Sequence, residues 1–150
     1  MDVGVMHVLN GKNISNDFKC RQFVDGSEYI YHIPGYPIPL ARPRLSKNGV
    51  WDCQRHVKTD IGFYLNFLHK NKPLFTGPLH ITLEFFLKIP KKKKDSLWHT
   101  SRPDLDNMIK FYLDVAIGIL YEDDRQISKI TASKMYDENP RTLLTIHPLN

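Results

Sequence analysis

The sequence contains little cysteine and no long apolar run, and each shortage excludes a class of protein. Cys20 and Cys53 stand far apart without a C-x-x-C spacing, which argues against a structural zinc site and a disulfide scaffold and predicts reduced thiols. The longest nearly apolar stretch, 111–121, is interrupted by Asp114 and is shorter than the roughly 20 residues that span a membrane. The first residues lack a basic segment, so we expect no secretory signal, no membrane partner and a cytoplasmic location.

Acidic residues are the minority charge, and they are concentrated in one stretch. Lys and Arg number 21 against 16 Asp and Glu, which gives a formal net charge of +5 and favours a polyanionic partner such as nucleic acid. The basic residues that gather outside this stretch or at its edge are Arg42, Arg44, Lys91, Lys92, Lys93, Lys94 and Arg102. The acids gather at Asp104, Asp106, Asp114, Glu122, Asp123 and Asp124. The concentration of carboxylates in one stretch of a basic chain indicates a specific function for them.

The hydrophobic pattern predicts a single α+β domain. Alternation predicts strands over 29–33, 79–89, 127–135 and 143–147, and three- and four-residue steps predict helices over 55–70 and 106–119. This order of elements favours a mixed β-sheet with helices packed on it. The proline-rich segment 35–44 is expected to be an extended loop, because proline supplies no ladder donor. Residues 1–27 are expected to form an N-terminal extension, with a short strand near Val3 and Val5.

The acidic stretch has the spacing of a metal site. Asp104 and Asp106 share one face of an extended chain, and Asp106, Lys110 and Asp114 follow at helical steps of four. We expect the acids after the short helix, Asp123 and Asp124, to return near the first two. Clustered carboxylates repel one another unless a cation neutralises them, and ligands that are all oxygen select Mg²⁺ or Mn²⁺.

Three structural interpretations compete with the metal site. Asp104 or Asp106 can cap the helix, the residues spaced by four can form ion pairs on a solvated face, and Asp123 with Asp124 can form a turn. Other phosphate or cation motifs fail, because no glycine-rich phosphate loop is present and Met108 with Ile109 replace the ligand and glycine of a calcium loop.

The segment Arg102-Pro-Asp104-Leu-Asp106-Asn107, with Lys110, Asp114 and Asp123-Asp124, resembles the signature of the RusA family of Holliday-junction resolvases. The resemblance covers about residues 29–146, includes Arg42-Pro43-Arg44, and implies an endonuclease domain over 28–150 with a RusA-like fold. It implies that Lys110 is an essential basic residue and that the catalytic, Mg²⁺-binding carboxylates are Asp104, Asp106 and Asp124. Asp123 is a further candidate metal ligand. The family implies a homodimer that cuts four-way DNA junctions with paired symmetric nicks, in recombination and repair.

The chemistry of phosphodiester hydrolysis agrees with this resemblance. A metal ion held by aspartates can activate water and neutralise the phosphoryl oxygens. The basic residues named above would contact phosphates rather than read bases, although the lysine run is equally compatible with a solvated loop. Two alternatives remain open: a magnesium nuclease for flaps or forks, and a non-catalytic protein that binds DNA structures through a structural metal site.

Overall fold

The computed structural model describes residues 21–22, 28–70, 72–92 and 95–150 of the chain. The strands are β1 (Arg21–Gln22), β2 (Tyr29–Pro34), β3 (Arg44–Ser46), β4 (Gly49–Trp51), β5 (Leu79–Lys88), β6 (Ile127–Asp137) and β7 (Arg141–Pro148). The helices are α1 (Arg55–His69), α2 (Leu105–Ala116) and the short 3₁₀ helix η1 (Asp124–Gln126). Among these residues, no helix is both long and apolar enough to cross a membrane.

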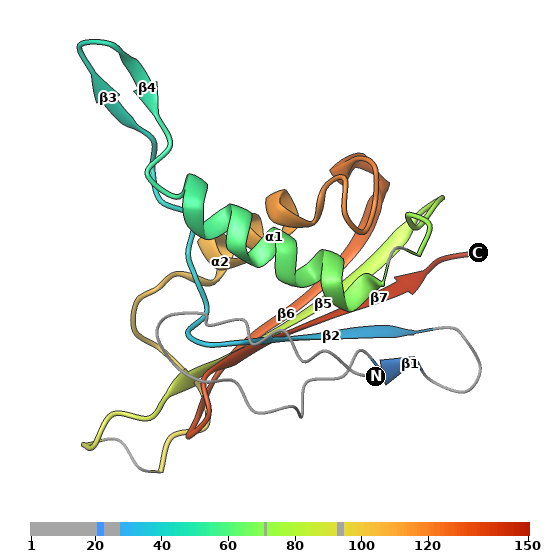
Figure 1. The fold of residues 1–150 in the computed structure, drawn as a ribbon. Coiled ribbons are helices and arrows are strands. Elements are labelled where there is room, and N and C mark those ends of the chain that lie inside the picture. Colours follow the sequence, from blue (N-terminus) through green and yellow to red (C-terminus); the bar gives the residue numbers. More distant parts are fainter. Residues whose placement is uncertain (1–20, 23–27, 71, 93–94) are drawn as a thin grey trace, which may run out of the picture.

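Five strands form one mixed sheet in the order β1-β2-β7-β5-β6, and β3 pairs with β4 in a separate hairpin. β5 and β6 are parallel, whereas the other neighbours in the sheet are antiparallel. A parallel pair needs a crossover connection, and α2 supplies it between β5 and β6. After β5 the chain runs back beside β6 as a loop, and α2 then leads toward the start of β6 (Figure 1).

The core lies between the sheet and the two helices, which cover the same face (Figure 1). In β5 every second residue from Leu79 to Leu87 is buried, as strict alternation along a strand requires. Gly62 of α1 lies against Ile119, and a Cβ at this position would be 3.3 Å from the Ile119 Cδ1 atom. The absence of a side chain thus lets α1 approach the turn that follows α2. The predicted α+β fold with a mixed sheet is confirmed.

The elements differ from the predictions mainly at their ends. The predicted helix over 106–119 ends at Ala116, because Ile117 is extended and Gly118 takes a φ of +76° that suits glycine. The predicted extended loop over 35–44 ends at Pro43, since Arg44 already belongs to the β3–β4 hairpin. This hairpin was not among the predicted elements. The predicted N-terminal extension, its Val3–Val5 strand included, lies outside the described residues apart from Arg21 and Gln22.

Candidate active site at the start of α2

Asp104 and Asp106 lie at the N-terminal end of α2. Asp104 occupies the N-cap position with φ −74° and ψ 140°, yet its side chain makes no capping hydrogen bond, and Asp106 lies in the first turn. Both residues are exposed. Within the part of the chain that the structure describes, neither carboxylate has a hydrogen-bond or ion-pair partner. Two carboxylates are therefore presented to solvent next to the positive end of a helix dipole, and the capping interpretation is wrong for Asp104.

The loop that carries Asp104 is held by Lys134 of β6. The Lys134 ammonium donates to the carbonyl oxygens of Ser101 and Pro103, both at 2.8 Å. The backbone just upstream is also attached to β6, since the His99 amide donates to the Lys134 carbonyl at 3.1 Å. Nothing in the sequence pointed to Lys134, because a lone lysine in a strand carries no local signal of such a role. These bonds fix the backbone that immediately precedes Asp104.

The proline-rich segment lies along the other side of the first turns of α2. The Leu40 amide donates to the Asn107 carbonyl at 2.9 Å, and the Ile38 amide donates to the Tyr112 hydroxyl at 3.2 Å. Arg42 and Arg44, which follow this contact, are both exposed. Two predicted DNA-binding residues therefore leave the body of the protein beside the helix end that carries Asp106.

The remaining predicted basic residues precede α2 in the chain. Lys91 and Lys92 are exposed in the loop that follows β5, and Arg102 is exposed two residues before Asp104. Lys93 and Lys94 lie outside the described residues. In Figure 1 this loop lies beyond the end of β5, away from the start of α2, so the structure does not place the two described lysines beside the acid pair.

Lys110 and Asp114 continue along α2 from Asp106. Lys110 is exposed and Asp114 is half-buried, but no ion pair joins either of them to Asp106 or to each other in the described residues. The interpretation of these residues as ordinary helix-surface ion pairs is therefore not supported. Lys110 lies one turn from Asp106, and its ammonium is available to a ligand at that end of the helix.

Asp123 and Asp124 lie in the loop between α2 and β6. Asp123 caps η1 and accepts hydrogen bonds from the amide and the guanidinium of Arg125, both at 2.9 Å. The hydrogen bond from the Arg125 side chain, assisted by the one from its amide, lowers the pKa of Asp123 to about 2. Asp123 is thus already engaged in an ion pair, whereas Asp124 beside it is exposed. The predicted turn and the predicted Asp124 site are compatible, because Asp123 supplies the cap.

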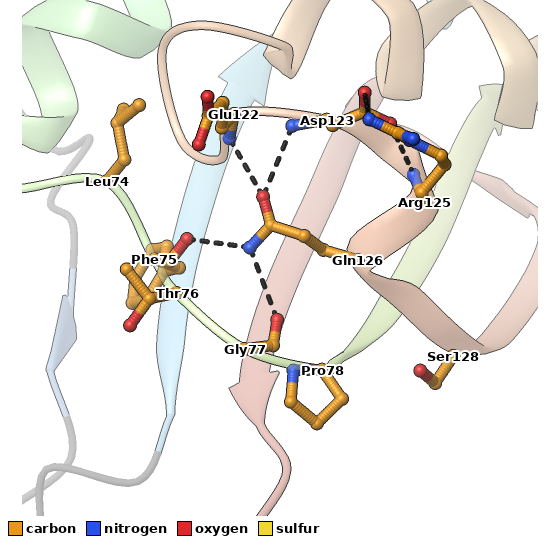
Figure 2. A pocket seen from close by; sticks show the side chains of 10 residues that line it. All are labelled: Leu74, Phe75, Thr76, Gly77, Pro78, Glu122, Asp123, Arg125, Gln126 and Ser128. Atoms are coloured by element: carbon orange, nitrogen blue, oxygen red, sulfur yellow. Dashed lines mark hydrogen bonds and ion pairs between the residues drawn. The ribbon is translucent and has the colours of Figure 1, made fainter.

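Gln126 fixes this loop to the segment before β5, as Figure 2 shows. Its side-chain oxygen accepts from the amides of Glu122 and Asp123, at 3.0 and 3.2 Å. Its side-chain nitrogen donates to the carbonyls of Phe75 and Gly77, at 2.9 and 3.2 Å. All four groups line one open pocket (Figure 2). The sequence contained a signal for Gln126, since the D-x-x-Q spacing from Asp123 is that of a capping box.

The structure does not bring the two groups of acids together within one chain. Asp104 and Asp106 lie where α2 begins, whereas Asp124 follows its end, and the 12 residues of α2 rise about 18 Å. Asp124 and Asp114 instead both lie near Tyr121: burial raises the pKa of Tyr121, and the two carboxylates raise it further. No three His, Cys, Asp or Glu side chains among the described residues are placed to hold one metal ion. The expectation that the later acids return to the first two is therefore wrong for a single chain.

Comparisons with known proteins identify the family. The sequence profile described as "Endodeoxyribonuclease RusA" matches residues 34–147. "Uncharacterized protein YqaN" of Bacillus subtilis (strain 168) is 27% identical over 138 residues, which cover 80% of this chain and 96% of that protein. "Crossover junction endodeoxyribonuclease rusA" of Lactococcus phage r1t is 40% identical over 84 residues, which cover 53% of this chain and 64% of the phage protein. The chain therefore belongs to the RusA family of endodeoxyribonucleases.

Proposed function

We propose that this protein is a magnesium-dependent endonuclease that resolves four-way DNA junctions by paired, symmetric cleavage. The observation that carries the proposal is the pair of exposed aspartates, Asp104 and Asp106, which lack protein partners in the described residues. Arg102 lies two residues before Asp104, and the segment that leads to Arg42 is bonded to the first turn of α2. Membership of the RusA family and the name of the phage relative support this substrate. We assign the activity to residues 28–150, preceded by an extension over 1–27, and expect it to act on DNA inside the cell.

The donor set fits a hard divalent cation. Asp104 and Asp106 offer only carboxylate oxygens, which suit Mg²⁺ or Mn²⁺ better than softer metals, and no His or Cys joins them in the described residues. When bound, such a cation lowers the pKa of a coordinated water and neutralises charge on the phosphate. Lys110, one turn farther along α2, stabilises the negative charge that develops on the phosphate. The exposed Arg42, Arg44 and Arg102 with the lysine loop hold the flanking phosphates, contacts that position DNA without reading its sequence.

We further propose that the protein acts as a homodimer in which Asp124 of one copy completes the site of the other. One chain separates Asp124 from Asp106 by the length of α2, so a single copy presents only part of a metal site at each end of the helix. A two-fold dimer repeats every contact, and two composite sites would then form at once. A four-way junction has the same two-fold symmetry, which paired nicks on opposing strands require.

A gel assay on synthetic DNA tests the activity. Four-way, flap and linear DNAs carrying the same arm sequences are incubated with Mg²⁺, with Ca²⁺, or with a chelator. We expect cleavage of the four-way junction with Mg²⁺, binding with little turnover with Ca²⁺, and no cleavage under chelation. Asp106→Asn should abolish cleavage, whereas Asp60→Asn, at an exposed acid of α1, should leave it unchanged. Cleavage that survives thorough chelation, or that prefers flaps, would contradict the proposal.

A mixed dimer tests the shared site. Two differently tagged chains, one with Asp106→Asn and one with Asp124→Asn, are co-expressed, and the mixed dimer is isolated through both tags. If Asp124 crosses to the other copy, one of the two sites in this dimer keeps both acids, and single nicks should appear. A site contained within one chain would leave both sites inactive. The matched control combines Asp106→Asn with Asp104→Asn, which removes an acid from both sites in either arrangement and should remain inactive.

A further inference from the structure

The β3–β4 hairpin projects away from the five-stranded sheet and beyond the helices (Figure 1). Its turn is built by the sequence Ser46-Lys47-Asn48-Gly49: the Ser46 hydroxyl donates to the Gly49 carbonyl at 3.0 Å, and the Asn48 amide donates to the Ser46 hydroxyl at 3.3 Å. Gly49 takes a φ of +120°, which other residues rarely adopt. The hairpin is therefore a defined element with its own turn chemistry.

The base of the hairpin is tied to the candidate active site. The side-chain oxygen of Gln54 accepts from the Ala41 amide, and its nitrogen donates to the Pro39 carbonyl, both at 2.8 Å. Gln54 thereby joins the chain that enters the hairpin to the chain that leaves it. Between these two anchored residues, the Leu40 amide is bonded to the Asn107 carbonyl in the first turn of α2. The six residues from Arg42 to the turn can extend about 20 Å from this anchor.

The hairpin exposes large apolar side chains that no described residue covers. Leu45 and Val50 are cross-strand partners, so their side chains share one face, and they are 87% and 70% exposed. Trp51, which pairs with Arg44, is 59% exposed. An isolated two-stranded hairpin is at best marginally stable in water, and exposed apolar groups gathered on one element indicate a binding surface.

The charge of the hairpin indicates what binds to it. Residues 35–51 contain Arg42, Arg44 and Lys47 but no Asp or Glu. The first acid beyond the hairpin, Asp52, is bonded to the Lys58 ammonium at 2.9 Å and so is already neutralised. A partner that is anionic and also offers flat apolar faces matches this surface, and DNA with accessible bases has both properties.

We propose that the β3–β4 hairpin is a DNA-binding arm whose apolar residues, Leu45 and Val50 on one face and Trp51 on the other, pack against bases exposed at the branch point of a junction. The inference rests on the proposed function and assigns the recognition of branched DNA to this element. Arg44 and Lys47 hold the adjacent phosphates. In a continuous duplex the bases are stacked on one another and their flat faces are covered. At a branch point the flat face of the last base pair of an arm is accessible, and apolar side chains and indole rings can stack on it or insert beside it. The arm thus favours branched over linear DNA.

A pair of matched double variants tests the arm. Leu45→Thr with Val50→Thr removes the apolar face and keeps residues that suit strands. The control, Phe63→Gln with Phe67→Gln, removes two side chains of α1 that are 68% and 65% exposed and lie outside the arm. Binding is measured with Ca²⁺ on a four-way junction that carries 2-aminopurine beside the branch point, and on a linear duplex. For the wild type and the control we expect 2-aminopurine fluorescence to rise on binding. For the arm variant we expect most of this rise to be lost, with junction affinity about tenfold weaker and duplex affinity within twofold of the wild type.

A second measurement, of tryptophan fluorescence, leaves the residues of the hairpin unchanged. The chain has two tryptophans, so Trp98→Phe leaves Trp51 as the single reporter. Stacking of Trp51 on a base should quench its emission on junction binding, with a smaller change on duplex.

The outcomes are distinct. An arm variant that binds and unstacks the junction like the wild type, or Trp51 emission that does not respond to the junction, overturns the assignment. So does an arm variant that light scattering shows to have become monomeric, since the hairpin would then be an interface between copies. Magnesium cleavage by the wild type is followed in parallel. If cleavage occurs and the arm variant binds the junction like the wild type, only this inference fails. If the arm variant loses junction binding but the wild type does not cleave, the proposed function fails and the assignment of the DNA-binding arm stands.

Discussion

Lys134→Met is the perturbation that best tests whether the loop before α2 is positioned for catalysis. The substitution keeps a linear apolar stem and removes the ammonium that bonds to the Ser101 and Pro103 carbonyls, both at 2.8 Å. The Ser101 bond is exposed and can be replaced by water, whereas the Pro103 bond is partly buried. A hydrogen bond from a charged group contributes about 1.5–3 kcal/mol. Counting only the buried bond, we expect the free energy of unfolding to fall by about 2 kcal/mol.

The larger effect of Lys134→Met is expected on chemistry. Asp104 directly follows Pro103, so a freed loop displaces one of the proposed metal ligands, and a misplacement of about 1 Å can cost about 100-fold in rate. We expect the single-turnover cleavage rate to fall by about two orders of magnitude and the Mg²⁺ concentration at half-maximal rate to rise. Junction affinity in Ca²⁺ should change little, because the phosphate contacts are made by other residues.

The assay combines single-turnover cleavage across a Mg²⁺ series with thermal unfolding and gel-shift binding. Lys129→Met, at an exposed lysine of the same strand, is the matched control and should behave as wild type. Lys134→Arg should recover part of the rate, since a guanidinium can still donate to both carbonyls. A variant that loses stability but keeps the wild-type rate and Mg²⁺ dependence would refute the positioning role.

Three other sets of substitutions test separate parts of the structure. Asp106→Asn should reduce cleavage by orders of magnitude and preserve junction binding. Arg44→Ala should instead weaken binding to all DNAs and lower the slope of log affinity against log salt concentration by about one unit. Gel shifts and single-turnover rates measured side by side separate the two effects, and normal cleavage by Asp106→Asn would indicate that the acids have only a structural role. Gln126→Ala removes four hydrogen bonds from the loop around Asp124. The free energy of unfolding, measured by thermal melts, should fall by about 1–3 kcal/mol, and the single-turnover cleavage rate should also fall. His69 is buried against Tyr31, and burial lowers its pKa below the ordinary value near 6.5. As the pH falls, His69 is protonated at a higher pH in the unfolded chain than in the folded one, so the free energy of unfolding should fall below about pH 6.5, by at most about 1.4 kcal/mol per pH unit. Urea unfolding between pH 7.5 and 5.5 measures this slope. His69→Phe should reduce the slope.

Local patterns in the sequence predict the main elements and the spacing of the acids. The strand of β5 and the helices α1 and α2 follow from hydrophobic periods of 2 and about 3.6 residues, which depend on neighbours in the chain and hold wherever the element packs. The same locality placed Asp104 and Asp106 at the start of one helix. The hairpin also carried a local signal, the Asn48-Gly49 turn between apolar pairs, which the proline pattern before it concealed.

The way in which distant segments meet depends on the folded chain. The parallel pairing of β5 with β6 makes α2 a crossover, and this topology places Asp124 at the opposite end of the helix from Asp106, which no spacing in the sequence reveals. Lys134 is 30 positions from Asp104, and it reaches the loop only because β6 runs beside the segment that precedes α2. Periodicity constrains residues within one element, whereas contacts between elements depend on which strands pair and in which direction. The Lys134 bonds that hold the loop before Asp104, and the separation of Asp124 from Asp106, are therefore visible only in the folded chain.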